Sequence, residues 1–313
     1  MSRIKYKIRI GGLQTPDGTI SIKALREVLD VLLESSERGL RLAVQGESVK
    51  RGTVPAWLSK SLDFTITGLE EGSTVLDIEA PELGGTALEQ IAEQDLWYSK
   101  PAPEDTALTL LSRSVRDTTS ENLESDTYDA GVLEGLLSFE SILRNFAQRI
   151  EFDCDERPRE HFELGCDEIE KIRRLKTYTP EPMTFVVSGE LDMIQHSSKR
   201  FHLLVSERQT IPGTVDPKSL SAEDLRQWWG KKVTIKGLVH FRPSRKVRLI
   251  EAQVIKAKAE GEEVFERVPV PPTTMELFES PRKPTATTGP LMELWGKWPG
   301  DESIEEILAA LKE

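Results

Sequence analysis

The feature that most constrains the fold of this chain is a series of strand-like segments between residues 184 and 257. Three such segments come first, a short helical stretch follows, and two more strand-like segments complete the series. The strands are predicted at 184–194, 200–206, 209–216, 231–241 and 246–257, with the helix at 221–229. Because strands that follow one another closely tend to pair, this order predicts a small five-stranded β-barrel over residues 181–258.

The order β-β-β-α-β-β resembles that of the OB-fold, in which the helix lies between the third and fourth strands. The resemblance rests on element order and covers about a quarter of the chain. It implies binding of single-stranded nucleic acid on a basic face, and the candidate residues are Lys199, Arg200, His202, Lys236, Arg242, Arg245, Lys246 and Arg248. Few aromatic side chains accompany them, so these residues could equally form solvated strand faces.

The first 180 residues favour an α+β domain. Residues 4–10 alternate apolar and polar side chains before Gly11 and Gly12, as a half-buried strand and its turn do. A helix is expected from Ile22, with Ser21 as its N-cap. The runs 62–69 and 73–79 predict a hairpin, and helical periodicity recurs at 86–97, 107–115 and 129–146. We therefore expect a sheet backed by helices, followed by the barrel.

Charge is distributed unevenly along the chain. The net charge is −12, which argues against indiscriminate binding of nucleic acid by the whole molecule. Residues 183–258, however, carry a net charge of +7, and residues 259–313 carry −7. The acidic tail could therefore compete for the basic face of the barrel.

The carboxyl-terminal part divides into a Pro/Thr-rich acidic linker, 259–290, and a segment at 291–313 that ends in a short amphipathic helix. Trp295 and Trp298 precede an apolar stripe at helical spacing, formed by Ile304, Ile307, Leu308 and Leu311. A helix this short is marginal in isolation and needs a surface to dock on. That surface could belong to a partner protein or to the chain's own domains.

Residues 298–311, WPGDESIEEILAAL, resemble the C-terminal tails of antitoxins that partner PIN-domain (VapC-type) ribonuclease toxins. The resemblance covers about twenty residues and implies that the tail wraps a toxin. The partner-binding residues would be Leu294, Trp295, Lys297, Trp298, Ile304, Ile307, Leu308, Leu311 and Lys312. In the family a basic side chain approaches the toxin's metal centre, a role open here to Lys297 or Lys312. The family's terminal arginines are absent after Arg282, which weakens that part of the comparison.

Catalytic and cofactor sites are not indicated by the sequence. Cys154, His161 and Cys166 lack the close cysteine pairs of zinc sites. The acidic residues Asp153, Asp155, Glu156 and Glu160 read as a solvated loop rather than a cation site. We therefore expect no catalytic residues, no metal and no cofactor.

Cysteine content and hydropathy bear on location. With two cysteines, no signal-peptide pattern and no apolar run of membrane-spanning length, a cytoplasmic protein that does not enter membranes is expected.

Taken with the resemblance of the tail, the sequence predicts an antitoxin-like regulatory protein. The alternatives are a nucleic-acid-binding protein whose acidic tail regulates its barrel and, third, an enzyme with its centre in the first half.

Overall fold

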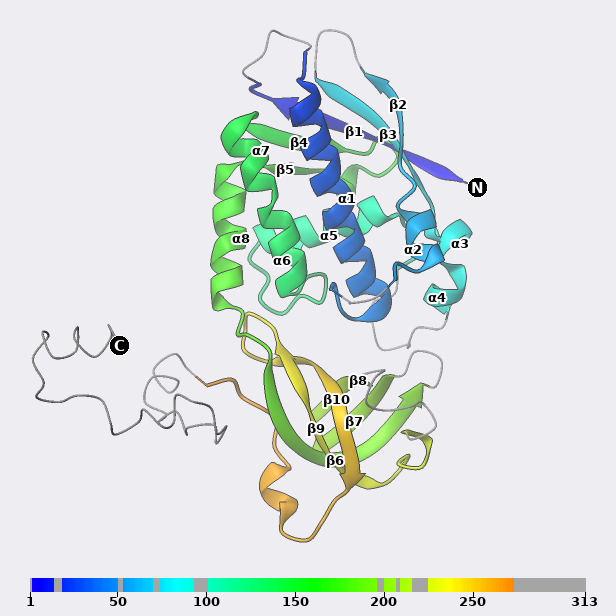
Figure 1. The fold of residues 1–313 in the computed structure, drawn as a ribbon, viewed down its shortest axis with the longest axis vertical. Helices are drawn as coiled ribbons and strands as arrows, with labels where there is room; N and C mark the ends of the chain where they lie inside the picture. Colours follow the sequence, from blue (N-terminus) through cyan, green and yellow to red (C-terminus); the bar gives the residue numbers. More distant parts are fainter. Residues whose placement is uncertain are drawn as a thin grey trace, which may run out of the picture. The chain divides into compact units, whose positions relative to one another are not determined.

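A computed structural model describes residues 2–13, 19–49, 53–69, 74–92, 101–195, 200–206, 209–215 and 225–272, with only the backbone of 193–195 and 206. The chain divides into two compact units, Met1–Pro271 and Pro272–Glu313. The first unit contains a sheet covered by helices and, after it, a closed barrel (Figure 1). The α+β fold class is therefore confirmed. The predicted boundaries near 180, 258 and 290 stay predictions, and the predicted terminal helix lies outside the described residues.

The N-terminal sheet has five antiparallel strands in the order β2-β3-β1-β4-β5. Their bounds are β1 Arg3–Gly11, β2 Thr65–Leu69, β3 Val75–Pro81, β4 Arg149–Asp153 and β5 Phe162–Leu164. The central strand, β1, pairs with β3 through Tyr6 and Ile78 and with β4 through Ile8 and Phe152. Both neighbours of the first strand in the sheet thus come from segments far along the sequence.

The alternation in β1 places its two faces in different environments. Ile4, Tyr6, Ile8 and Ile10 are buried in the main hydrophobic core. The residues between them point the other way, where Lys5 lies 3.8 Å from Glu79, and Arg9 lies 3.2 Å from Asp153. One face of the sheet therefore meets the helices, and the other carries cross-strand ion pairs.

Eight α-helices belong to the described part of this domain. They are α1 Ile22–Gln45, α2 Ala56–Ser61, α3 Leu83–Thr86, α4 Leu88–Ala92, α5 Ala107–Thr119, α6 Ala130–Leu137, α7 Phe139–Asn145 and α8 Cys166–Tyr178. The predicted N-cap of α1 is confirmed, because the Ser21 side chain accepts a hydrogen bond from the amide of Ala24 at 3.1 Å. The helix ends at Gly46, whose φ of 82° is in the left-handed region that glycine tolerates best.

The helices that cover the sheet also contact one another. In Figure 1, α6 lies between α1 and α8 and contacts both, and α1 also packs on α5. Val28 and Leu32 of α1, Leu111 of α5 and Ile172 of α8 join the buried side of β1 in one core. This packing fixes the carboxyl end of α1, which contributes to the site described below.

Two predicted helices differ from the structure. The expected helix 129–146 is divided at Ser138 into α6 and α7, because the Ser138 amide donates to Gly135, three residues back, and so tightens the turn. The expected helix 86–97 is replaced by α3 and α4, and residues 93–100 lie outside the described part. The amide of Leu83, at the start of α3, donates to the carbonyl of Asp105. A tertiary contact thus determines where this segment turns.

The barrel is built from β6 Met183–Gln195, β7 Arg200–Ser206, β8 Gln209–Val215, β9 Lys232–Phe241 and β10 Val247–Ala257. It closes in the order β10-β8-β7-β6-β9, with β8 and β10 parallel and the other pairs antiparallel. The first strand of the barrel lies between the second and fourth, and the third pairs in parallel with the fifth, as in an OB-fold. The predicted barrel is confirmed. Most of the predicted helix 221–229 lies outside the described residues.

The barrel interior is filled by side chains rather than open. Phe201 is fully buried there, and its ring lies against Gly213 on the neighbouring strand. A Cβ atom at Gly213 would lie 2.2 Å from that ring, so only glycine fits. The centre of the barrel is therefore a core, and a ligand would have to bind on its outer surface.

None of the described helices is long and apolar enough to cross a membrane.

Candidate functional site

Four of the eight barrel residues predicted to bind nucleic acid contact the N-terminal domain through hydrogen bonds or ion pairs, namely Arg200, Arg242, Lys246 and Arg248. Within the unit Met1–Pro271, Arg200 of β7 donates to the carbonyl of Val44 at 3.0 Å, and Arg248 of β10 donates to that of Gly46 at 2.8 Å. These carbonyls lie at the carboxyl end of α1, where helix carbonyls lack intrahelical partners and carry partial negative charge. Two arginines of the predicted face therefore donate hydrogen bonds to carbonyl groups at the end of a helix.

The loop between β9 and β10 makes ion pairs with the segment that precedes α6. Arg242 lies 3.2 Å from Asp126 through its Nε atom, and Lys246 lies 2.9 Å from Glu124. Lys246 and Glu124 are mostly exposed, and such pairs contribute about 0–1 kcal/mol. The hydrogen bond to Lys246 lowers the pKa of the Glu124 carboxyl. The sequence analysis did not anticipate these acidic partners.

The other predicted barrel residues lie in different surroundings. Arg245 has a φ of 68° and donates to the carbonyl of Pro271 at 2.5 Å. Lys236 is exposed on β9, and His202 lines a cavity between β7 and α1. Lys199 lies outside the described residues. The predicted basic residues therefore do not form one continuous open surface.

A small cavity lies between the barrel and the helices of the N-terminal domain. Its volume is about 120 Å³, and it lies beside β7 and β8, the strands on which OB-folds bind ligands. Arg113, Arg200, His202 and Arg248 line it together with apolar side chains such as Leu42. Ligand pockets usually measure about 300–1,000 Å³, so this cavity suits water or a small anion better than a base or a sugar.

His240, which is half-buried, and Arg248, which is buried, both line a second hollow of about 350 Å³. Burial is the main reason why the pKa of His240 falls to about 4, and the charge of Arg248 lowers it further, against the opposing effect of Asp129. Arg248 is only 8% exposed, and its Nη2 atom lies 3.6 Å from Asp129. His240 is therefore neutral at pH 7 and positioned by packing.

The residues considered for metal binding are dispersed. Cys154 is buried, which raises the pKa of its thiol, and Cys166 is exposed. His161 accompanies Asp153, with 2.6 Å between Nδ1 and Oδ1. Over the ranges that the structure describes, no group of three or more histidine, cysteine or acidic residues is arranged to hold a metal ion. Glu160 departs from the expected solvated loop, because it is buried.

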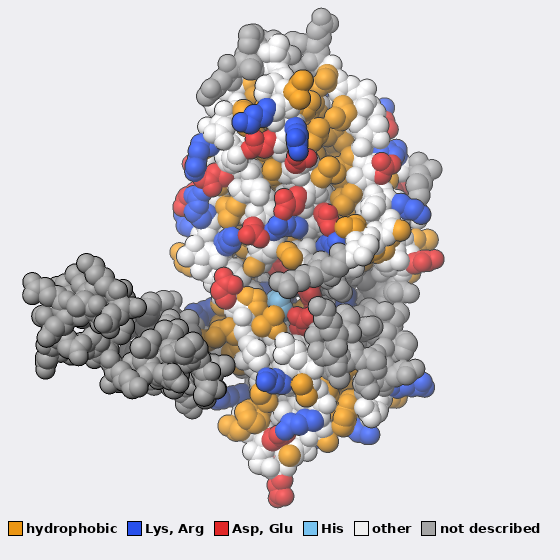
Figure 2. Space-filling model, viewed as in Figure 1, with side chains coloured by type: hydrophobic (Ala, Val, Ile, Leu, Met, Phe, Trp, Pro, Cys, Tyr) orange, Lys and Arg blue, Asp and Glu red, His pale blue; other side chains and the backbone are white. Residues whose placement is uncertain are grey.

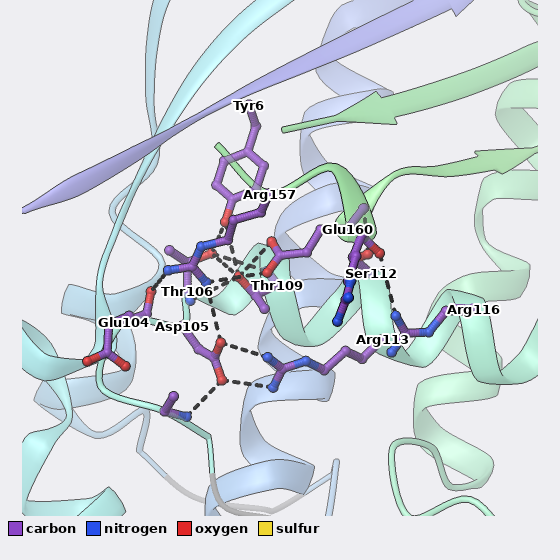
Figure 3. A network of polar contacts seen from close by, with 12 residues as sticks. Tyr6, Glu104, Asp105, Thr106, Thr109, Ser112, Arg113, Arg116, Arg157 and Glu160 are labelled. Carbon is purple, nitrogen blue, oxygen red and sulfur yellow. Dashed lines mark hydrogen bonds and ion pairs between the residues drawn. The ribbon is translucent and has the colours of Figure 1, made fainter. Parts of the chain in front are cut away.

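Glu160 belongs to a buried polar network that sequence reasoning missed (Figure 3). The hydroxyl of Tyr6 lies 2.7 Å from that of Thr106 and 3.1 Å from that of Thr109. Thr109 in turn donates to the carboxylate of Glu160 at 3.0 Å, and Arg157 lies 3.3 Å from the other carboxylate oxygen. Burial raises the pKa of Tyr6. The period-two pattern identifies Tyr6 as inward-facing but gives no sign of its polar partners.

The partner-binding residues predicted in the tail all lie outside the described residues. They are Leu294, Trp295, Lys297, Trp298, Ile304, Ile307, Leu308, Leu311 and Lys312.

On the face of Met1–Pro271 seen in Figure 2, acidic and basic side chains are interspersed over the N-terminal domain. That view thus offers no broad basic surface on this domain.

Comparison with protein families, with curated proteins and with solved structures finds no match to this chain.

Proposed function

We propose that this chain is an antitoxin-like binding protein whose segment 291–313 holds and neutralises a PIN-domain ribonuclease toxin. The observation that carries the proposal is the division of the chain between Pro271 and Pro272. The three hydrophobic cores of the described residues are formed by side chains from Ile4 to Val268. In this proposal the apolar residues of the tail serve a partner protein and are not part of these cores.

The chemistry of the tail supports this role. Burying one tryptophan removes about 150–250 Å² of surface from water, worth about 4–6 kcal/mol before entropic costs. Trp295 and Trp298 are adjacent on the chain to an apolar helical stripe, the pattern of an anchor followed by a helix in a groove. Tryptophans often dominate the binding energy of such interfaces.

The test is affinity capture of the product of the neighbouring gene, which this proposal expects to be a PIN-domain ribonuclease, with Trp295→Ala, Trp298→Ala and Leu308→Ala combined in the full-length protein. We expect capture and neutralisation to be lost. Trp229→Ala provides a matched control, because Trp229 is 68% exposed on the barrel and belongs to no predicted interface. A toxin that remains bound to the triple variant would contradict the proposal.

A second candidate function is the binding of single-stranded nucleic acid by the barrel. The observation in its favour is the OB-type closure, with Arg200 and His202 beside the cavity on the β7 side. Against it, Arg242, Lys246 and Arg248 pair with acidic residues of the N-terminal domain. Binding through this face would require those pairs to open.

Salt dependence separates the second candidate from the first. If the barrel binds an oligonucleotide, its affinity falls steeply with salt, and deletion of residues 273–313 strengthens it by removing acidic competition. Arg200→Gln should weaken that binding, whereas Arg26→Gln, on an exposed surface of α1, should leave it unchanged. Binding that is insensitive to both salt and Arg200→Gln would exclude this function.

A further inference from the structure

A second group of arginines lies on the N-terminal domain and plays no part in the function proposed above. Arg113 and Arg116 of α5 and Arg157 and Arg159, near the short helix Pro158–Glu160, line an open hollow of about 410 Å³. Glu156, Pro158 and Glu160 complete its wall. In a chain of net charge −12, four guanidinium groups around one hollow are a local reversal of charge.

Two of these arginines are fixed in position by hydrogen-bond acceptors on the segment before α5 (Figure 3). Arg113 donates through Nη1 and Nη2 to the two carboxylate oxygens of Asp105, at 2.8 and 2.7 Å. The Asp105 side chain is only 3% exposed, and it is itself held by the amide of Ala102 at 2.8 Å. Arg157 donates to the carbonyl of Glu104 at 2.6 Å. Both guanidinium groups are therefore preorganised, which lowers the entropic cost of binding a ligand.

The other two arginines are not explained by this network. The Arg116 side chain is 54% exposed, and the nearest carboxylate oxygen paired with it, on Asp117, is 4.0 Å away. Its Nη1 atom lies 3.5 Å from the backbone carbonyl of Arg159. Arg159 is exposed, and no carboxylate in the described part of the chain forms an ion pair with its side chain. Like charges brought together in this way repel each other unless an anion lies between them.

The acidic groups nearby leave the hollow positive. The Glu160 carboxylate accepts from Thr109 and pairs with Arg157, and Asp105 is occupied by Arg113. Glu156 is the exposed carboxylate of the wall. The lining itself holds four arginines and two glutamates, an excess of two positive charges, and Asp105 and Asp117, which pair with Arg113 and Arg116, are not part of that lining.

We propose that this hollow binds a phosphate group, held by Arg116 and Arg159 at its open side and by Arg113 and Arg157 deeper in its wall. Arginine forks match the oxygens of phosphate, and each Arg113 or Arg157 side chain keeps N–H donors beyond those engaged in the network. Among the described residues of the lining there is no aromatic side chain on which a base could stack. The phosphate itself is therefore the recognised group, whether it belongs to a small molecule or to a nucleic-acid backbone.

The experiment is calorimetric titration of the full-length protein with inorganic pyrophosphate at low ionic strength. Replacing both exposed arginines, Arg116→Gln with Arg159→Gln, should weaken binding roughly tenfold or more. Both residues lie outside the buried network, so the variant should fold, and circular dichroism verifies this. Arg26→Gln is the matched control for charge alone, since Arg26 is 82% exposed on α1. Glu156→Gln should strengthen binding, because it removes the opposing charge.

A mononucleotide and a single-stranded thymidine oligonucleotide distinguish the two sources of phosphate. Loss of oligonucleotide binding in the double variant assigns the hollow to a nucleic-acid backbone, and loss of pyrophosphate and mononucleotide binding alone assigns it to a small phosphorylated molecule. The proposal is overturned if the native protein fails to bind pyrophosphate at millimolar concentration. It is also overturned if the double variant binds pyrophosphate as the native protein does, or if Arg26→Gln has an equal effect.

Discussion

The guanidinium group of Arg248, on the last strand of the barrel, donates to the carbonyl oxygen of Gly46, at the end of the first long helix, across 2.8 Å. The same side chain is 8% exposed and lies 3.6 Å from Asp129, the N-cap of α6. One arginine thus contacts the end of one helix and the beginning of another. It is one of several polar contacts between the barrel and the N-terminal domain, beside those made by Arg200 and Arg242.

Arg248→Met should therefore lower the free energy of unfolding by about 2 kcal/mol, the usual worth of a buried hydrogen bond to a charged group. Lys246→Met is the control, because the Lys246–Glu124 pair is mostly exposed and should contribute less than about 1 kcal/mol. Urea unfolding of both variants measures the difference. Equal losses in the two variants would show that burial of Arg248 has no energetic importance.

Stability should also depend on pH through His240. Its pKa is about 4 in the folded protein against an ordinary value of 6.5, so the folded state favours the neutral ring and the unfolded state binds the proton more readily. Stability from this group is complete above pH 6.5 and is lost as the pH falls toward 4. Between pH 7 and 5 the loss is at most about 2 kcal/mol.

The measurement is denaturant unfolding at pH 7 and pH 5, with His240→Asn compared with the native protein. The variant should lose this part of the pH dependence, whatever its stability at pH 7. His161→Asn, at the exposed histidine beside Asp153, should keep it. If the slopes of the native protein and His240→Asn coincide between these pH values, the histidine is not titrating as described.

Tyr6→Phe should destabilise the N-terminal domain by about 1–2 kcal/mol, because the hydroxyl that meets Thr106 and Thr109 is buried. The two threonine hydroxyls lie 3.3 Å apart and can partly satisfy each other, which limits the loss. Tyr178→Phe removes a hydroxyl from a side chain that is 59% exposed and should have little effect. Thermal unfolding followed by circular dichroism compares the two.

Two glycines should respond to alanine in opposite directions. Gly213→Ala would place a methyl group 2.2 Å from the Phe201 ring and should cost about 1–3 kcal/mol or more through overpacking. Gly39 lies inside α1, where an added Cβ would meet other atoms at 3.8 Å, an ordinary contact. Gly39→Ala should therefore stabilise the protein by about 0.5–1 kcal/mol. Chemical denaturation of each variant decides both signs, and destabilisation by Gly39→Ala would mean that α1 and α5 are more tightly packed than these distances indicate.

The elements that local pattern determines could be predicted. The alternation of residues 4–10 gives β1, Ser21 gives the start of α1, and β7 has the predicted bounds, 200–206. These succeed because period and capping are properties of neighbouring residues. The barrel followed from element order, since short connections restrict how five strands can pair.

Other features depend on residues far apart in sequence and escaped prediction. The strands β4 and β5 have five and three residues, too few for a clear period, and are defined by pairing with β1 and with each other. Asp126 lies in the polar segment before α6, where no periodic pattern indicates a partner, and it pairs with Arg242. A count of charges shows that the barrel is basic but not which acids face it. The contacts of Asp105 with Arg113 and Arg157 were missed for the same reason.

The position of β1 at the centre of its sheet has a consequence for synthesis on the ribosome. One edge of β1 is filled by β3, but the other is filled by β4, which ends at Asp153. Until residue 153 has left the ribosome, the nascent chain exposes the unpaired backbone groups along one edge of β1 beside the apolar face of a helix. Intermediates of this kind bind chaperones and aggregate readily. Truncated products that stop before β4 should therefore accumulate as insoluble material rather than as a smaller folded domain.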